Sequence, residues 1–426
     1  MAKHHKKPNP VQQQKLLTAH QRKEFFRRFE NLLFVLSGSR QVYDSLNDKA
    51  LELIYINRCA APKVTAAPGQ PVDEKDFKIM KEWIIDYLHE NTCVVNDQGK
   101  EILLSDFCTV GLTLYSTDLK VDEIKYTDAY KETVNKFKHR IDHLDPSFYI
   151  PAQVLRKMVF KGTVFRSNFK SNLYWGDLKS VNIPGGSDPY KYIKFEISCC
   201  RQEKKKLLLD DGMRPAVRVG WGHEEVGMDW CSRSVGSCAD GDDEQTTALP
   251  VYIQMHALDR LEERMDCENP AILHYHVFEA VSGCKIIKGF NNNYLIEYVY
   301  FERKTGYLSA VIQDGKLIIR TFLFLTNNGT PEGRLLHKLT GLQKLDKEFL
   351  SIDKQSTFLD PEIRKNQTIR HLFTEAGCGQ LFEMTVKDVF NPEVHNTHVS
   401  SMKMMNYMKL EPKENEAWSA FLAGGM

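Results

Sequence analysis

The chain has 426 residues, of which 42% are hydrophobic and 27% charged, and its formal net charge is +1 at pH 7. This composition excludes a disordered or collagen-like chain, and at about 100 to 200 residues per domain the length predicts two or three packed units. A near-neutral total predicts no strong global attraction to nucleic acid or to membranes, although it leaves room for a local charged patch.

The ten cysteines are too sparse for a secreted domain held together by disulfides, which favours reduced thiols. No apolar run approaches the roughly 18 residues that span a bilayer. The basic, glutamine-rich N-terminus is not followed by the apolar core of a signal peptide. We therefore expect a cytoplasmic protein without a membrane segment.

Residues 1–30 are locally basic, with eight Lys and Arg residues against two glutamates, an excess of six charges (8 − 2). Apolar residues from Leu16 to Leu36 recur at helical spacing, and an amphipathic helix with a solvated basic face produces the same pattern. Residues 1–59 are therefore predicted to be a basic helical region that binds RNA, binds a protein partner or is simply solvated. The cations with the best claim to phosphate contact are Lys3, Lys6, Lys7, Arg27 and Arg28.

Residues 60–72 contain three prolines and a glycine, which predict a linker. Asp73 can then cap a helix that runs through Asn91, and a second amphipathic helix is expected at about 127–144. Short strand patterns at 101–104 and 112–115 make 73–153 an α+β region.

Residues 154–230 show short apolar pieces, including 159–160 and 164–165, separated by Gly, Asn, Asp and Pro. This pattern predicts a β-rich region of short hairpins. Residues 231–248 contain four Asp and Glu residues and almost no apolar side chain, so we expect an acidic exposed loop and a boundary. A C-terminal extension, 346–426, follows the next region, 249–345.

Several segments resemble the start of a metal-binding or cofactor-binding motif but lack the residue spacing that the motif requires. His223-Glu224 begins like a zinc-protease helix, but Gly227 stands where the second histidine is needed. His395 and His398 lack a flanking Cys or carboxylate pattern. The cysteines form no close Cys-x-x-Cys pair, and no phosphate-binding glycine loop appears. We expect neither a metal nor a cofactor.

The segment from Tyr252 to Met265 has the clearest pattern. His256, Arg260 and Arg264 are each four residues apart, a spacing that advances about 400° around an α-helix and therefore aligns them in one row. The neighbouring stripe of Leu258, Leu261 and Met265 can face a core. Two arginines at this spacing repel each other unless an anion lies beside them, and a carboxylate or a phosphate can be that anion.

The residues after this row predict a compact α+β unit over 249–345. A second helix is expected at about 270–281, followed by strands at 284–288, 294–301, 308–313 and 317–326. Turns are predicted at 291–293, at 304–306 and at 314–316, where Asp314-Gly315 is a strong hairpin pattern. The chain as a whole is therefore predicted to be α+β, with a helical N-terminal region, a β-rich middle and a helix-helix-antiparallel-meander module.

His256, Ala257, Arg260 and Arg264 on an opening helix, followed by Asp314-Gly315 and a strand that carries Thr321, resemble a small uncharacterised bacterial family. That family is grouped with toxin-like ribonucleases of the barnase, colicin and RelE type. The resemblance covers about residues 249–341. It implies a module that acts on RNA as a metal-independent endoribonuclease, or that binds RNA phosphates without cleaving them, with His256, Arg260, Arg264 and Thr321 as catalytic residues. Arg320, next to Thr321 on the last strand, is a further candidate for contact with RNA.

Metal-independent RNA cleavage requires a proton acceptor, a proton donor and cations over the phosphate. The ordinary pKa of imidazole lies near neutrality, which suits His256 as an acid or a base. A guanidinium group binds phosphate through two parallel hydrogen bonds. Only one of the adjacent Arg320 and Thr321 can face a given side of a sheet. The alternative is that carboxylates pair with Arg260 and Arg264, and that the chain is a structural or interaction protein, such as a phage or mobile-element component. Candidates for those carboxylates are Glu262, Glu263, Asp266 and Glu297.

Overall fold

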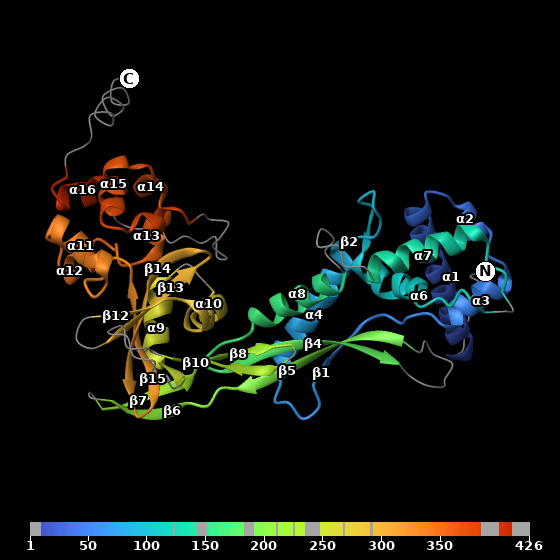
Figure 1. Cartoon of the computed structure of the whole chain (residues 1–426), viewed down its shortest axis with the longest axis horizontal. Helices are drawn as coiled ribbons and strands as arrows, with labels where there is room; N and C mark the ends of the chain where they lie inside the picture. The colour runs from blue at the N-terminus through green and yellow to red at the C-terminus, as the bar shows by residue number, and fades with distance from the viewer. Residues whose placement is uncertain are drawn as a thin grey trace, which may run out of the picture. The chain divides into compact units, whose positions relative to one another are not determined.

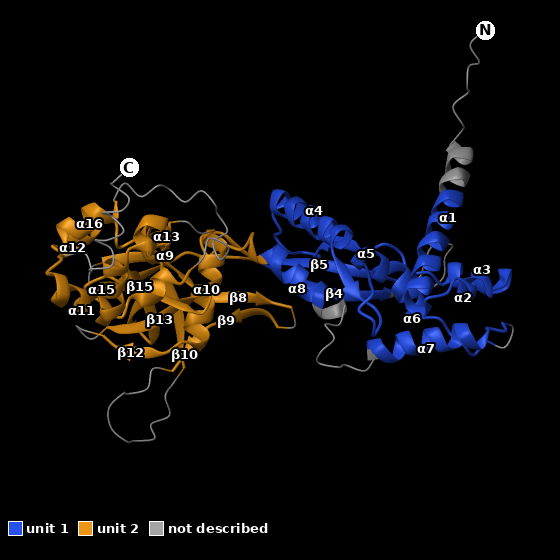
Figure 2. Ribbon diagram, turned by 90° about the horizontal axis from the view of Figure 1, so that it is seen from above, with its two compact units in different colours: residues 1–163, 174–199 blue, residues 164–173, 200–426 orange. Residues whose placement is uncertain are grey.

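The computed structural model describes residues 10–121, 124–142, 151–182, 191–209, 212–224, 226–234, 248–266, 269–289, 293–384 and 400–410. The chain is α+β, as predicted, and divides into two compact units (Figure 2). Unit 1 comprises residues 1–163 and 174–199, and unit 2 comprises residues 164–173 and 200–426. Among the described helices, none has both the length and the apolarity that crossing a membrane requires.

Unit 1 consists mainly of helices around a small sheet. Its helices are α1 (Pro10–Ser37), α2 (Gln41–Asp44), α3 (Asp48–Ile56), α4 (Glu74–Glu90), α5 (Leu104–Asp106), the π-helix η1 (Phe107–Gly111), α6 (Leu112–Tyr115), α7 (Asp128–Asp142) and α8 (Pro151–Val164). Its strands are β1 (Lys63–Ala66), β2 (Thr92–Val94), β3 (Glu101–Leu103), β4 (Asn172–Asn182) and β5 (Lys191–Arg201). The strand order is β1-β5-β4 in one sheet, with β1 parallel to β5, while β2 and β3 form a separate hairpin.

Helical periodicity explains the two longest helices of unit 1. Phe25, Phe29 and Leu32 recur every three or four residues of α1 and are buried in the core of the unit. Asp73 caps α4 by accepting a hydrogen bond from the backbone N–H of Asp76, which confirms the predicted start of that helix.

Three local predictions for unit 1 are wrong. The apolar pieces at 159–160 and 164–165 are the buried stripe of α8 and its end, because Leu155, Met158 and Val159 repeat with the helical period. Residues 112–115 form α6 instead of a strand. The predicted linker 60–72 contains β1, which gains its hydrogen bonds from the distant strand β5.

Unit 2 is built on a large mixed sheet (Figure 1). Its strands are β6 (Lys205–Leu209), β7 (Gly212–Arg218), β8 (Gly220–His223), β9 (Gly227–Trp230), β10 (Ser232–Arg233), β11 (Leu249–Gln254), β12 (Ile286–Lys288), β13 (Tyr294–Tyr300), β14 (Arg303–Gln313) and β15 (Lys316–Phe324). Its helices are α9 (Met255–Arg264), α10 (Pro270–Gly283), α11 (Pro331–Thr340), α12 (Lys344–Phe349), α13 (Gln355–Leu359), α14 (Pro361–Lys365), α15 (Gln367–Glu375), the 3-10 helix η2 (Gly379–Phe382) and α16 (Ser401–Tyr407).

The sheet of unit 2 has the strand order β12-β13-β14-β15-β11-β7-β6, with β10 beside β11. Strands β11 and β15 are parallel, and the other pairs are antiparallel. The predicted helix pair and meander are therefore present, but β6 and β7, which precede residue 249, extend the same sheet. Helices α9 and α10 lie on one face of this sheet, and α11 lies on the other (Figures 1 and 2).

Two tight turns connect the meander. Asp314 and Gly315 both have positive φ, 49° and 67°, as the predicted hairpin between β14 and β15 requires. The turn between β13 and β14 falls at Phe301 and Glu302, whose φ values are 42° and 65°, and the prediction of a turn at 304–306 is wrong. Gly306 instead lies within β14, where an added Cβ would meet the carbonyl oxygen of Leu323 at 2.3 Å. That glycine allows a close approach of two strands.

Candidate functional site

The row of His256, Arg260 and Arg264 lies on α9, which begins directly after β11. Leu258 and Leu261 are fully buried in the core of unit 2, so the apolar side of α9 faces the sheet as predicted. His256 is exposed near the start of the helix, and among the described residues no hydrogen bond or ion pair reaches its imidazole. The helix thus presents a single unengaged imidazole to solvent.

Arg260 pairs with a carboxylate on its own helix. Its Nη1 lies 2.6 Å from Oε2 of Glu263, and its side chain is 40% exposed. An exposed pair at this spacing stabilises a helix by only about 0.3–0.5 kcal/mol. Glu263 therefore occupies Arg260 without holding it strongly.

Arg264 is engaged much more completely. Its side chain is 12% exposed, and its Nη1 contacts Oδ2 of Asp353, whose carboxylate is buried. Its Nη2 lies 3.7 Å from Oε1 of Glu348 and 4.0 Å from Oε1 of Glu263. A buried guanidinium requires such a partner, because an uncompensated charge in a low-dielectric interior costs several kcal/mol. Carboxylates therefore take the place beside Arg264 that a phosphate would need.

Thr321 and Arg320 lie on β15 at a β-bulge. Ser309 of β14 pairs with Thr321 and the next residue, Ala310, pairs with Ile319, which leaves Arg320 as the extra residue. Paired residues share a face, so Thr321 lies on the same face as Ser309 and Tyr307. The hydroxyl of Tyr307 contacts Glu332 of α11 at 3.1 Å.

The opposite face of the sheet carries α10, because the hydroxyl of Tyr298 donates a 3.1 Å hydrogen bond to the carbonyl of Leu273. Helix α9 lies on that face together with α10 (Figures 1 and 2). The structure therefore does not bring Thr321 to the His256 row. Its hydroxyl lies 3.5 Å from the carbonyl oxygen of Phe322.

Another edge of α9 carries a buried polar cluster that the sequence did not indicate. His274 of α10 is fully buried, and its Nδ1 accepts a 3.2 Å hydrogen bond from the backbone N–H of Phe169. Its Nε2 therefore carries the proton and lies 3.2 Å from Oε1 of Glu262. Lys170 donates to the other oxygen of Glu262 at 2.8 Å and to Asp259 at 2.7 Å.

Burial determines how His274 titrates, since it lowers the pKa of the imidazole more than Glu262 raises it. For Glu262, burial acts in the upward direction, but the hydrogen bonds from His274 and Lys170 outweigh it and lower the pKa of the carboxyl. The cluster thus contains a neutral, enclosed imidazole, which ties residues 164–173 to α9 and α10 within unit 2.

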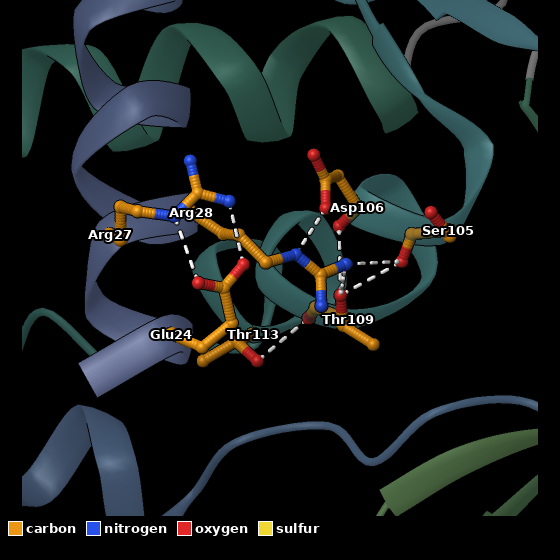
Figure 3. A network of polar contacts seen from close by, with 7 residues as sticks. All are labelled: Glu24, Arg27, Arg28, Ser105, Asp106, Thr109 and Thr113. Carbon is orange, nitrogen blue, oxygen red and sulfur yellow. Dashed lines mark hydrogen bonds and ion pairs between the residues drawn. The ribbon is translucent and has the colours of Figure 1, made fainter. Parts of the chain in front are cut away.

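Of the predicted N-terminal phosphate contacts, Arg27 and Arg28 are described, and both contact carboxylates of unit 1 (Figure 3). Arg28 is 26% exposed, and its Nε contacts Oδ1 of Asp106. Its Nη2 donates to the carbonyl of Ser105 at 3.1 Å and to the hydroxyl of Thr109 in η1 at 2.9 Å. The guanidinium thus links α1 to the segment that contains the π-helix.

Arg27 is exposed, and it pairs with Glu24 on the same helix at 2.6 Å. Its place on the surface leaves its guanidinium accessible to an anion. The predicted phosphate contacts Lys3, Lys6 and Lys7 lie outside the described residues.

The predicted site residues that the structure describes form no group able to hold a metal ion, and they do not line the cavity in unit 1. Within the described parts of the chain, no group of three or more His, Cys, Asp or Glu side chains is placed to hold a metal ion. His223 and Gly227 lie on the two strands of the β8-β9 hairpin, so this segment is not a helix. His395 and His398 lie outside the described residues. A cavity of about 510 Å³ in unit 1 is lined by residues of α1, α2 and α7 and by 95–98, and none of the predicted site residues line it.

Comparison of the chain with protein-family models, with curated proteins and with solved structures finds no match in any of the three. The described residues themselves therefore carry the evidence on function, above all the carboxylates that pair with Arg260 and Arg264.

Proposed function

We propose that the protein is a non-catalytic interaction protein, in which the row on α9 stabilises unit 2 and does not cleave RNA. One observation carries this proposal: the guanidinium of Arg264 lies against the buried carboxylate of Asp353 and near that of Glu348. The charge of Arg264 is already offset by a buried carboxylate, so this guanidinium stabilises a bound phosphate only weakly.

The local charge balance supports the same conclusion. Arg260, Arg264 and Lys344, which lies 3.7 Å from Glu348, contribute three positive charges, and Glu263, Glu348 and Asp353 contribute three negative ones, a net charge of zero (3 − 3). Phosphate cleavage gains its rate from an excess of positive charge where the anion develops. A balanced environment of this kind offers no excess of positive charge to the substrate or to its transition state.

The other imidazole that packs against α9 is not available for proton transfer. Cleavage by the 2′-hydroxyl needs an acid and a base, each within hydrogen-bond reach of the reacting atoms. His256 supplies one such group. The nearest other imidazole described above, that of His274, is fully buried and engaged by Phe169 and Glu262.

Helix α1 offers a surface for a partner. Its residues from Thr18 to Gln21 are exposed, as are Lys23 and the ring of Phe34. Phe25 and Phe29 anchor the middle of α1 in the core of unit 1, whereas residues 18–21 are exposed. A deletion of residues 1–21 therefore removes the exposed residues that precede Arg22 without removing the core.

The experiment that tests this assignment compares the size of the full chain with that of a chain lacking residues 1–21. We expect the deletion to abolish binding of a partner or self-assembly, measured by light scattering, while the circular dichroism spectrum of the remainder is preserved. Unchanged assembly after the deletion would contradict a partner surface on α1.

A second candidate is a metal-independent endoribonuclease, and the exposed imidazole of His256 favours it. A phosphate that displaced Glu263 from its surface pair with Arg260 would lie beside this imidazole. Incubation of single-stranded RNA with the protein in EDTA distinguishes the two candidates. The first predicts no cleavage that depends on His256, and the second predicts cleavage that His256→Ala removes.

A further inference from the structure

No described residue covers an apolar patch where α12 and α16 meet in unit 2, and this patch does not depend on whether the unit cleaves RNA. Leu345 is 75% exposed, Phe349 54% and Met402 61%, and Tyr407 is also exposed. We call these four residues the α12–α16 patch. Large side chains gathered in this way usually mark a surface that binds another segment.

Specific contacts fix the two helices against each other. The rings of Phe349 and Tyr407 lie 5.4 Å apart, and the hydroxyl of Tyr407 donates to Asp346 at 2.6 Å. Helix α16 is also anchored from beneath, since Ser401 donates to Glu362 at 2.7 Å and Met404 and Met405 are buried. The patch is therefore a built surface, and its exposure does not result from a loosely held helix.

The rim of the patch is positively charged. Exposed Lys344 and Lys403 lie on the same two helices, exposed Lys409 follows α16, and Nζ of Lys403 lies 4.8 Å from the ring centre of Phe349. The nearby carboxylates are engaged, since Asp346 accepts from Tyr407 and Glu348 lies 3.7 Å from both Lys344 and Arg264. An apolar surface with a basic rim fits an amphipathic segment with an acidic rim.

The sequence that follows α16 has this chemistry. Residues 411–426 contain Glu411, Glu414 and Glu416 against Lys413, a net charge of −2 (1 − 3). Their large apolar residues are Trp418, Phe421 and Leu422, at the i, i+3, i+4 spacing that places anchors on one side of a helix. Seven residues lie between Leu410 and Trp418, and the eight Cα–Cα steps that join the two span up to about 28 Å in an extended chain. The anchors therefore reach the patch from the end of α16.

We propose that residues 411–426 of this chain bind the α12–α16 patch, with Trp418 and Phe421 against Leu345 and Phe349 and the glutamates beside the rim lysines. Because the segment is attached, its effective concentration at the patch is in the millimolar range, so weak contacts suffice for binding. Bound in this way, it withdraws the patch from solvent.

Amide hydrogen exchange of α12 and α16 in the full chain tests this proposal. Truncation after Leu410 is expected to speed exchange in α12 at least fivefold, and Trp418→Ala combined with Phe421→Ala is expected to do the same. Ser419→Ala, a matched change within the same segment, should leave exchange unchanged. Salt at 1 M should speed exchange in the unaltered chain by weakening the glutamate–lysine attraction.

Two results would overturn the proposal. The first is equal exchange in α12 with and without residues 411–426. The second is a full chain that is a dimer by light scattering and becomes a monomer with Leu345→Glu but not with Val226→Glu, an exposed control in the same unit. In that case, a second copy of the chain covers the patch.

Discussion

Arg264 of α9 lies against the carboxylate of Asp353, and both side chains are nearly buried. This relationship links the helix after β11 to the segment between α12 and α13. It gives the second arginine of the row a structural partner, and it explains how two arginines one helical turn apart coexist: Arg260 uses Glu263 and Arg264 uses Asp353.

Asp353→Asn tests the energetic weight of this pair. Removal of the charge leaves the buried guanidinium of Arg264 with only the more distant Glu348 and Glu263, and loss of the close partner in a buried pair costs about 3–5 kcal/mol. Urea unfolding of the full chain should show this loss as a lower midpoint. Glu348→Gln is the matched control, because that carboxylate is exposed and farther away, and it should cost under about 1 kcal/mol. Equal effects of the two changes would contradict the assignment.

Asp106→Ala tests the corresponding pair in unit 1. It leaves Arg28 without the carboxylate that faces its Nε, and the expected loss is about 1–3 kcal/mol of stability. Glu24→Ala removes the exposed partner of Arg27 and should cost under about 1 kcal/mol. Thermal unfolding followed by circular dichroism measures both, and a larger effect of Glu24→Ala would refute the structural role of Arg28.

The buried amine of Lys347 makes the stability of the fold depend on pH. Its amine is buried and donates to the carbonyls of Thr326 at 2.7 Å and Gly333 at 2.9 Å, and burial lowers its pKa from 10.5 to about 8. Between these two values, the unfolded chain binds more protons than the folded chain, so stability rises as the pH rises from about 8 to 10.5.

The variant Lys347→Met isolates this contribution. It lacks the titrating amine and leaves its acceptors unpaired, which costs about 1–3 kcal/mol for each buried group. The difference in urea midpoint between the unaltered chain and the variant should widen between pH 7.5 and pH 10. A difference that stays constant or narrows would show that the amine does not titrate in this range.

Gly306→Ala tests the close approach of β14 and β15. The added methyl group would meet the backbone carbonyl of Leu323 at 2.3 Å, which no side-chain rotation relieves. The expected cost is about 1–3 kcal/mol or more. Gly283→Ala adds its methyl group in open space at the end of α10 and should be nearly neutral. Similar stabilities of the two variants would contradict the strand pairing described.

The sequence predicted correctly those helices and turns that depend on residues close together in the chain. Asp73 marks the start of α4, Asp314-Gly315 marks a hairpin, and the spacing of Leu258 and Leu261 marks the buried side of α9. The strands predicted at 159–165 failed because a short apolar run fits a strand and a buried helical stripe equally well.

The partners of the site residues could not be predicted in the same way. Glu263 is close to Arg260 in sequence and was among the expected carboxylates. Asp353 and Glu348 belong to the segment after residue 345, and nothing in their local sequence points to α9. The position of Thr321 depends on a bulge at Arg320, and a one-residue insertion changes which face each later side chain occupies.

The rate of RNA cleavage by the unaltered chain relative to His256→Ala, measured in EDTA with both proteins purified side by side, tests the central claim most directly. A general acid or base contributes about 10²–10⁴-fold to a rate. A row on α9 that stabilises the fold predicts a ratio of one. A ratio of a hundred or more, with an unchanged unfolding midpoint for the variant, would contradict the account and establish His256 as a catalytic residue.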